Sequence, residues 1–317
     1  MGNSVFESAR QAFVVMKNEI KKYFSGKRMF VFLVLLGIIV FVIVVAPYFF
    51  DSKANPMYFY MMSSLVVLMA ATLFGSISIV SEFEERTALI LFTRPIRKTS
   101  IFIGKMMACL TLTIAFMLLY YIIAMVVSAI VDGIVSGELF VSFGLSCVYA
   151  FGTIGIAMFI SSIMKKGSTA TIITFVILAV IVTAVSMVLE ASSVNHSWMI
   201  DTASESIMNC STDYRDWYNG MMASIQASIG SPETFIAEPF YNPLLVNGTS
   251  YDGLILALTT PTGPNGETAW YLGEKIAESI GASLITAPDY LHDILVMFAW
   301  GAIGMVAAFL AFLRREF

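Results

Sequence analysis

Six long runs of apolar residues, separated by polar stretches, dominate the chain. Each run has 20 residues or more, and none of them contains Asp, Glu, Lys, Arg or His. About twenty apolar residues in a helix are enough to cross a bilayer. The pattern therefore predicts an all-α polytopic membrane protein. Its six transmembrane helices are expected at Met29–Phe50, Met57–Val80, Met106–Val131, Leu139–Met164, Ser168–Leu189 and Ile294–Leu313.

Residues 1–28, ahead of the first run, have an amphipathic pattern. Apolar side chains recur every three or four residues, at Phe6, Ala9, Phe13, Met16, Ile20 and Phe24. Basic side chains lie off that stripe, at Arg10, Lys17, Lys21 and Lys22. A helix packed on soluble protein would show the same periodicity, but the adjacent apolar run favours the membrane. We expect an elbow helix in the membrane interface, with its basic face toward anionic headgroups of the lipid bilayer.

Composition and charge agree with a membrane protein and set its orientation. Hydrophobic residues make up 58% of the 317 residues, and the mean hydropathy is +0.83. Fifteen of the 18 Lys and Arg residues lie in four segments, at 1–28, 81–105, 165–166 and 314–315. Basic residues concentrate in cytoplasmic loops. The distribution therefore predicts a multi-pass protein of the plasma (cytoplasmic) membrane with both termini cytoplasmic.

The connection between the second and third runs is the most charged part of the chain. It holds eight charged residues between residues 79 and 105. Ser81 followed by Glu84 is typical of a capping box, which starts a helix. Pro95 cannot continue a helix. The pattern predicts a cytosolic helix within residues 81–98.

This connection also carries a family resemblance. Glu82, Glu84, Thr87, Arg94-Pro95, Arg97 and Gly104-Lys105 follow one another in the order and spacing of a known loop. It resembles the first cytosolic loop of ABC-2-type transporter permeases, the transmembrane subunits of ABC exporters. Arg86 stands where that family usually has Gly.

The resemblance implies that residues 81–98 form a coupling helix that docks on a separate ABC ATP-binding subunit. ATP and Mg would then be bound by that partner, and none by this chain. A second permease copy, in a homodimer or a related heterodimer, would complete the pathway. The implied docking residues are Glu82, Phe83, Glu84, Glu85, Arg86, Thr87, Leu89, Phe92, Arg94, Pro95 and Arg97.

Two further features concern the packing of the runs. The fourth and fifth runs are joined only by Lys165-Lys166-Gly167, so they should be antiparallel neighbours, and Lys165 and Lys166 are expected to make a second cytosolic contact. Small residues permit close helix approach in membranes. They occur in the fourth run at Gly144, Gly152 and Gly155, and in the sixth at Gly301, Gly304 and Ala308.

Residues 191–289, between the fifth and sixth runs, differ from the rest in composition. With Glu190 they hold twelve acidic residues against only Arg215 and Lys275. Aromatic and aliphatic residues are too frequent for a disordered segment. We expect a mainly helical extracellular cap, followed by residues 290–317 with the last span and a cytosolic tail. The three N-x-S/T sequons of this cap, at Asn195, Asn209 and Asn247, are candidate N-glycosylation sites.

The sequence offers no catalytic or metal-binding pattern. His196 and His292 are isolated, and Gly104-Lys105 lacks the upstream Gly and the following Ser or Thr of a phosphate-binding loop. We therefore expect no enzyme activity in this chain, no metal site and no nucleic-acid partner. A proton- or sodium-driven carrier usually keeps an ionisable group inside the membrane, and the apolar runs have none.

These observations leave three hypotheses. The leading one is a permease subunit of an ATP-driven exporter. The alternative is a membrane-anchored scaffold or sensor whose acidic external domain binds a partner without transport. A passive channel is the third, and it predicts conductance without ATP.

Overall fold

The computed structural model of the chain is helical throughout its described part, which covers residues 2–50, 55–84, 97–192, 194–230, 285 and 287–314. Two compact units divide at Ser211, with residues 1–211 and 288–317 in the first and 212–287 in the second. The helices of the first unit are α1 (Gly2–Ser25), α2 (Lys27–Val45), η1 (Ala46–Phe50), α3 (Met57–Ala70), η2 (Ala71–Gly75), α4 (Val80–Glu84), α6 (Lys98–Val131), α7 (Glu138–Ile163), α8 (Gly167–Phe175), η3 (Val176–Ile181), α9 (Val182–Ala191), α10 (Ile200–Ser204), α11 (Ser206–Asn209) and α16 (Tyr290–Arg314).

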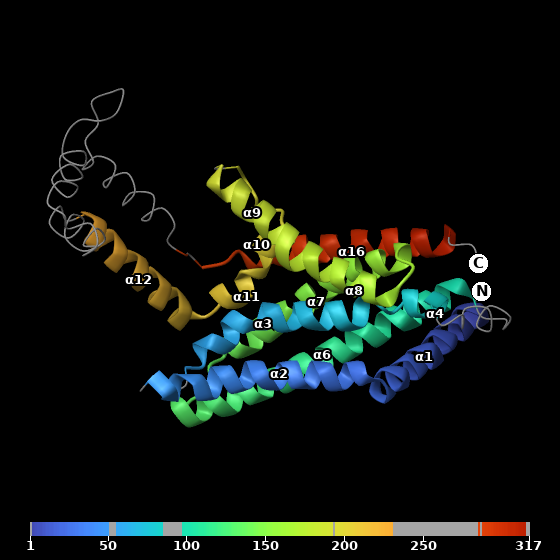
Figure 1. Cartoon of the computed structure of the whole chain (residues 1–317), viewed down its shortest axis with the longest axis horizontal. Helices are drawn as coiled ribbons and strands as arrows, with labels where there is room; N and C mark the ends of the chain where they lie inside the picture. The colour runs from blue at the N-terminus through green and yellow to red at the C-terminus, as the bar shows by residue number, and fades with distance from the viewer. Residues whose placement is uncertain are drawn as a thin grey trace, which may run out of the picture. The chain divides into compact units, whose positions relative to one another are not determined.

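The six predicted spans are confirmed. Within the described residues, six helical stretches are long and apolar enough to cross a membrane, and each contains most of one predicted run. The helix of the third span, α6, begins at Lys98, ahead of the apolar run that starts at Met106. Lys105, just before that run, is buried within the helix bundle. The start of α1 and the end of α16 lie at the same end of the first unit (Figure 1).

The fourth and sixth spans pack most closely, at glycines. A Cβ atom on Gly155 would lie 2.5 Å from the carbonyl oxygen of Gly301, and one on Gly304 would lie 2.6 Å from the carbonyl carbon of Gly155. The small residues at these positions therefore allow close helix approach, here between α7 and α16. Gly144 is different, since a Cβ there would meet no atom within 4 Å.

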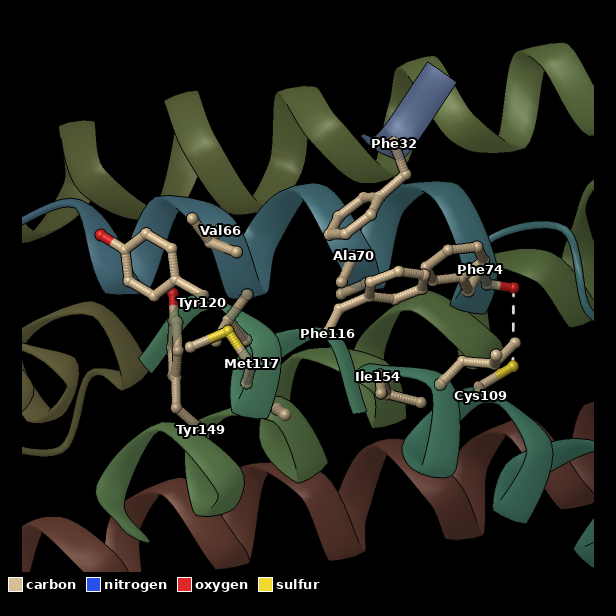
Figure 2. Close-up of a cluster of buried hydrophobic side chains, with 14 of the residues drawn as sticks. Phe32, Val66, Ala70, Phe74, Cys109, Phe116, Met117, Tyr120, Tyr149 and Ile154 are labelled. Atoms are coloured by element: carbon tan, nitrogen blue, oxygen red, sulfur yellow. Dashed lines mark hydrogen bonds between the residues drawn. The ribbon is translucent and has the colours of Figure 1, made fainter. Parts of the chain in front are cut away.

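Aromatic side chains fill the centre of the bundle. Phe32 of α2 points toward Phe74 and Phe116, with ring centroids 5.4 Å and 4.6 Å away (Figure 2). The rings of Phe74 and Phe116 are stacked at 5.8 Å. This cluster connects the first, second and third spans, and aromatic pairs of this kind stabilise beyond their buried area.

Residues 194–211, which the sequence places in the external cap, belong to the first unit. Ile200, Ala203 and Ile207 of α10 and α11 are buried, and the Trp300 indole of α16 donates a hydrogen bond to the Trp198 carbonyl at 2.9 Å. These two short helices therefore pack on the spans.

In the second unit the structure describes α12 (Thr212–Gly230) and a few residues before α16. The side chain of Asn219 makes two hydrogen bonds with the backbone of Ile285, at 3.0 Å and 2.9 Å. The helical prediction for the cap is confirmed over α12, and residues 231–284 lie outside the described residues.

Candidate functional site

The predicted docking segment is described only at its two ends. The described residues are Glu82, Phe83 and Glu84 before it and Arg97 after it. The remaining predicted contacts lie outside the described residues: Glu85, Arg86, Thr87, Leu89, Phe92, Arg94 and Pro95. The candidate site is therefore the base of this loop, where its two ends join the helix bundle.

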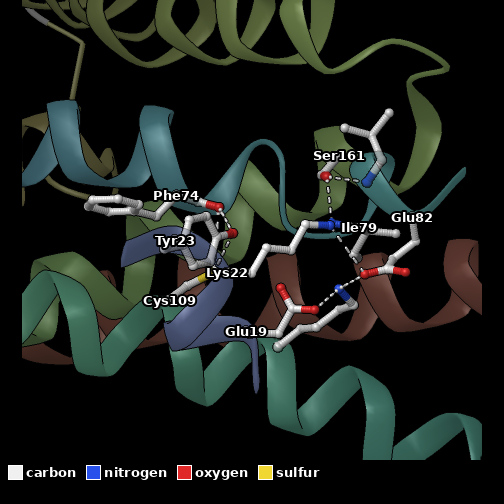
Figure 3. A network of polar contacts seen from close by, with 10 residues as sticks. Glu19, Lys22, Tyr23, Phe74, Ile79, Glu82, Cys109 and Ser161 are labelled. Carbon is white, nitrogen blue, oxygen red and sulfur yellow. Dashed lines mark hydrogen bonds and ion pairs between the residues drawn. The ribbon is translucent and has the colours of Figure 1, made fainter. Parts of the chain in front are cut away.

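The second span is interrupted just before the loop. Its helix widens into a π-helical turn, η2, and then gives way to a turn at residues 76–79 before α4 begins at Val80. The free backbone amides of Ile79 and Val80 both donate to the Ser161 hydroxyl of α7, each at 3.1 Å (Figure 3). On the other side of the break, the Phe74 carbonyl accepts a hydrogen bond from the Tyr23 hydroxyl at 2.8 Å.

Ser161 therefore accepts from the backbone amides at the start of α4, the role that the sequence analysis gave to Ser81 and Glu84. The carboxylate of Glu84 accepts instead from the backbone amide of Gly167, at 2.8 Å. That amide begins α8, so Glu84 supplies a negative charge and an acceptor at the start of a different helix. A helix carries its free donors at its N-terminus, and local spacing alone cannot tell which helix a carboxylate will reach.

Glu82 lies inside the bundle, in an ion-paired cluster. The ammonium of Lys105 is 2.9 Å from Glu82 Oε1 and 2.6 Å from Glu19 Oε1, and only 2% of the Lys105 side chain is exposed. Lys22 lies 3.7 Å from the same Glu82 oxygen. Figure 3 shows Glu19 of α1 and Glu82 of α4 pointing toward each other across this cluster. A buried charge without partners is costly, so the two carboxylates are what allow Lys105 to sit there.

Gly104 explains how Glu19 reaches Lys105. A Cβ at position 104 would lie 2.6 Å from the Ala12 carbonyl oxygen and 2.7 Å from the Val15 Cβ. Any larger residue would push α1 away from α6. Glu19 follows Ala12 by two helical turns and therefore lies on the same face of α1. The Gly104-Lys105 pair thus has a physical role: the glycine permits contact with α1, and the lysine forms the ion pairs.

The other sequence-predicted contacts surround this cluster. Lys165 and Lys166 are exposed at the turn between α7 and α8, directly before Gly167 and hence beside Glu84. A Cβ at Gly167 would lie 2.9 Å from Glu84 Oε2, so only glycine fits there without displacing the carboxylate. At the far end of the loop, the Arg97 guanidinium donates to the Ser8 hydroxyl of α1 at 3.1 Å. The structure therefore places both ends of the loop and the Lys165-Lys166 turn at one end of the bundle.

Glu19 is the residue that the sequence reading missed. A helix, α1, covers the predicted elbow and buries Ala12, Glu19 and Tyr23 against other helices. Phe13 and Phe24 of the predicted apolar stripe are exposed, and their contact with the membrane interface stays a prediction. The sequence did contain a signal for the buried face of α1, since Ala12, Glu19 and Tyr23 are spaced seven and four apart. The acidic Glu19 obscured this signal, because its partner Lys105 is 86 residues away in the sequence.

The opposite end of the bundle carries several neighbouring carboxylates. Burial, followed by the nearby carboxylates of Asp201 and Glu190, raises the pKa of the Glu205 carboxyl to about 7, although part of this residue reaches the surface. Burial also raises the pKa of Asp201. Asp289 caps α16 by accepting from the His292 amide at 3.3 Å, and the His292 ring lies 3.1 Å from Asp293.

The remaining predictions concern metal binding and glycosylation. Among the described residues, no group of three or more His, Cys, Asp or Glu side chains could hold a metal ion. Of the sequons, Asn195 is exposed in a turn, whereas Cys210 and Ser211 beside Asn209 are buried, and Asn247 lies outside the described residues.

Comparison with known protein families gives one match. The family described as ABC-2 family transporter protein matches residues 51–317, which leaves α1 and the whole first span outside the match. No curated protein matches the chain.

Proposed function

The chain belongs to the ABC-2 family of transporter proteins, and we propose that it is the transmembrane permease subunit of an ATP-driven exporter. A role as a transport permease in the membrane follows from the family and the six spans. The proposal adds that ATP hydrolysis takes place on a separate ATP-binding subunit, that residues 81–98 receive the motion, and that two permease copies form the pathway.

The observation that carries the proposal is the attachment of the loop at both ends. Glu82 is ion-paired with Lys105 of α6, Glu84 accepts from the first amide of α8, and Arg97 donates to Ser8 of α1. A loop that merely joined two spans would need none of these connections. A segment that receives force from a partner needs them, because motion must pass into more than one span.

The absence of charge from the centres of the six apolar runs supports an external energy source. A charged group at the bilayer centre costs about 2.5–3.5 kcal/mol or more and is kept where ions or protons must pass. The sequence places no such group in any of the six runs. Energy therefore has to enter from a partner, and the loop base is the part of the described chain whose charges are best placed to receive it.

The orientation in this proposal puts the loop, Lys165, Lys166 and both termini in the cytoplasm and the cap of residues 191–289 outside. The basic residues of the described loop base agree with the positive-inside tendency. The exposed lysines of the α7–α8 turn then face the ATP-binding subunit as a second contact, beside Glu84.

Co-purification with an ATP-binding subunit tests the proposal. The chain is expressed with a candidate subunit, and the amount retained on the tagged permease is measured. Charge reversal by Arg94→Glu, or by Lys165→Glu with Lys166→Glu, is expected to reduce retention about tenfold, as expected when charged contacts of an interface are replaced by repulsive ones.

Asp213→Lys is the matched control, because Asp213 is exposed on α12 in the predicted external part. It should leave retention unchanged. A stable permease that retains no ATP-binding subunit would overturn the proposal and favour the scaffold or sensor hypothesis.

A further inference from the structure

The break in the second span affects how motion of the loop can reach the bundle. If α3 and α4 formed one rigid helix, a displacement of the loop would pass directly along α3. Residues 76–79 interrupt the regular helix. Their backbone is held by turn hydrogen bonds, such as the one from the Ser81 amide to the Ile77 carbonyl, and also by side chains of other helices, Tyr23 and Ser161. A π-helical turn followed by such a break is a place where a helix can bend, so α4 can change its angle to α3 more easily than in a continuous helix.

α4 packs on α8 through Val80 and Ala170, and Lys22 of α1 lies 3.7 Å from Glu82. Among the described residues, three further polar contacts lead from α4 to α7, α8 and α6. The first is the Ser161 hydroxyl, shared by two amides and uncharged. The second is the bond from Gly167 to Glu84, whose side chain is exposed and therefore screened by solvent. The third is the Glu82–Lys105 ion pair, in which both side chains are buried. Separating this pair would leave charges buried without their partners, which is more costly than losing either of the other two contacts.

The helix that carries Lys105 suits this role. α6 runs unbroken for 34 residues, about 51 Å at 1.5 Å per residue, from the loop to the opposite end of the bundle. Its contact with α1 is close at Gly104, and the same ammonium also binds Glu19 of α1 at 2.6 Å. One cation therefore joins α4, α6 and α1.

We propose that Lys105 is a positioning residue that passes motion of the 81–98 segment to α6 through Glu82, while the break at 76–79 spares α3. Glu19 holds α1 to the same cation, so that α1 follows α6. The inference rests on the proposed function, because it requires a partner that moves the segment. The inference goes beyond the proposed function by naming the side chains that transmit the motion and the span that receives this motion.

Two single variants separate this role from simple stabilisation. Glu82→Gln removes the pair with α4, and Glu19→Gln removes the pair with α1. Each leaves Lys105 with one carboxylate, so the number of ion pairs lost by Lys105 is the same. Only Glu82→Gln breaks the connection from α4 to α6.

The experiment uses the complete permease with its ATP-binding subunit in phospholipid vesicles. Single cysteines replace Ser128 near the far end of α6, or Met57 at the start of α3, both of which are buried. Labelling by a maleimide that cannot cross membranes is timed with and without ATP and vanadate, and the labelling of the parent protein is subtracted.

In the otherwise unchanged protein, nucleotide should alter the labelling rate at position 128 by about tenfold, a typical size for coupling between sites, and alter that at position 57 much less. Glu82→Gln should remove the response at position 128 while the ATP-binding subunit is still retained. Glu19→Gln should preserve it.

Equal responses in the two variants, whether both lost or both kept, would overturn the inference. So would loss of the ATP-binding subunit from the Glu82→Gln complex, because Glu82 would then act in docking. Failure of the proposed function gives a different result: the unchanged protein itself would retain no ATP-binding subunit or show no nucleotide response at either position.

Discussion

The two ends of the helix bundle arrange their charged groups in opposite ways. At the loop base, the buried Lys105 lies between Glu19 and Glu82, and Lys22 is near Glu82. At the other end, burial and the charges of Asp201, Glu190 and Asp293 raise the pKa of the partly exposed Glu205, and His196 lowers it. The first arrangement pairs carboxylates with ammonium groups. The second favours the protonated form of Glu205.

This difference indicates which end is built to hold its geometry. Paired full charges fix the relative position of three helices, because any separation leaves a charge buried without a partner. Neighbouring carboxylates repel one another when ionised, which makes the packing of α10 and α11 on the spans dependent on pH. The loop base is therefore suited to transmit motion, and the opposite end is the one whose packing can loosen.

The largest expected effect is at the loop base. Lys105→Met leaves Glu19 and Glu82 buried, with only the partly exposed Lys22 near Glu82, and should lower the free energy of unfolding by about 3–5 kcal/mol. Thermal unfolding in detergent measures it. Lys17→Met, on the exposed face of α1, is the control and should change stability little. Adding Glu19→Gln and Glu82→Gln to Lys105→Met should recover most of the loss; if Lys105→Met alone is harmless, the ion pairs are not what holds this end.

A smaller effect is expected from the glycine that allows the cluster to form. Gly104→Val would press its side chain on the backbone of Ala12 and should cost about 1–3 kcal/mol, the usual range for overpacking. Gly144→Val in α7 is the matched control, since a Cβ there meets nothing within 4 Å. Comparable losses in the two variants would show that the cost comes from helix propensity rather than from the contact between α1 and α6.

The smallest expected effect is at the carboxylate end, and it depends on pH. The pKa of Glu205 is raised from about 4.5 to about 7, so the packed form binds the proton more tightly than the unpacked form. Packing of α10 and α11 should therefore be strongest below about pH 4.5 and weaken as the pH rises to about 7, where the loss is complete.

Cys210, buried at the end of α11, reports this change. Its labelling by a maleimide, divided by that of the denatured protein at the same pH, should rise between about pH 5 and pH 7 in the unchanged protein. Glu205→Gln should remove the rise. An identical rise in both proteins would assign the pH dependence to another group, such as His196.

The parts of the fold that local pattern determines could be predicted from the sequence. Runs of apolar residues give the spans, and small residues give the contact between α7 and α16. The charged 79–105 connection marks the functional region through its residue order. In each case the signal lies within one segment or its immediate neighbours.

The sequence could not show which charges are buried. Glu82 and Lys105 looked like solvated or docking residues, because a charge in a membrane protein is expected in water unless a partner is known. Glu19, the second partner of Lys105, is far away in the sequence and lies outside the family match. The capping box was wrong for the same reason, because the acceptor of the Ile79 and Val80 amides is Ser161 of another helix.

Site-specific photocrosslinking tests the central claim most directly. A photoreactive amino acid is placed at position 166, in the exposed turn beside Glu84, or at position 134, in the exposed turn at the opposite end of the bundle. The account predicts a covalent adduct with the ATP-binding subunit from position 166, with a yield that changes when ATP is added, and none from position 134. Adducts from position 134 only, or from neither position in an active complex, would contradict it.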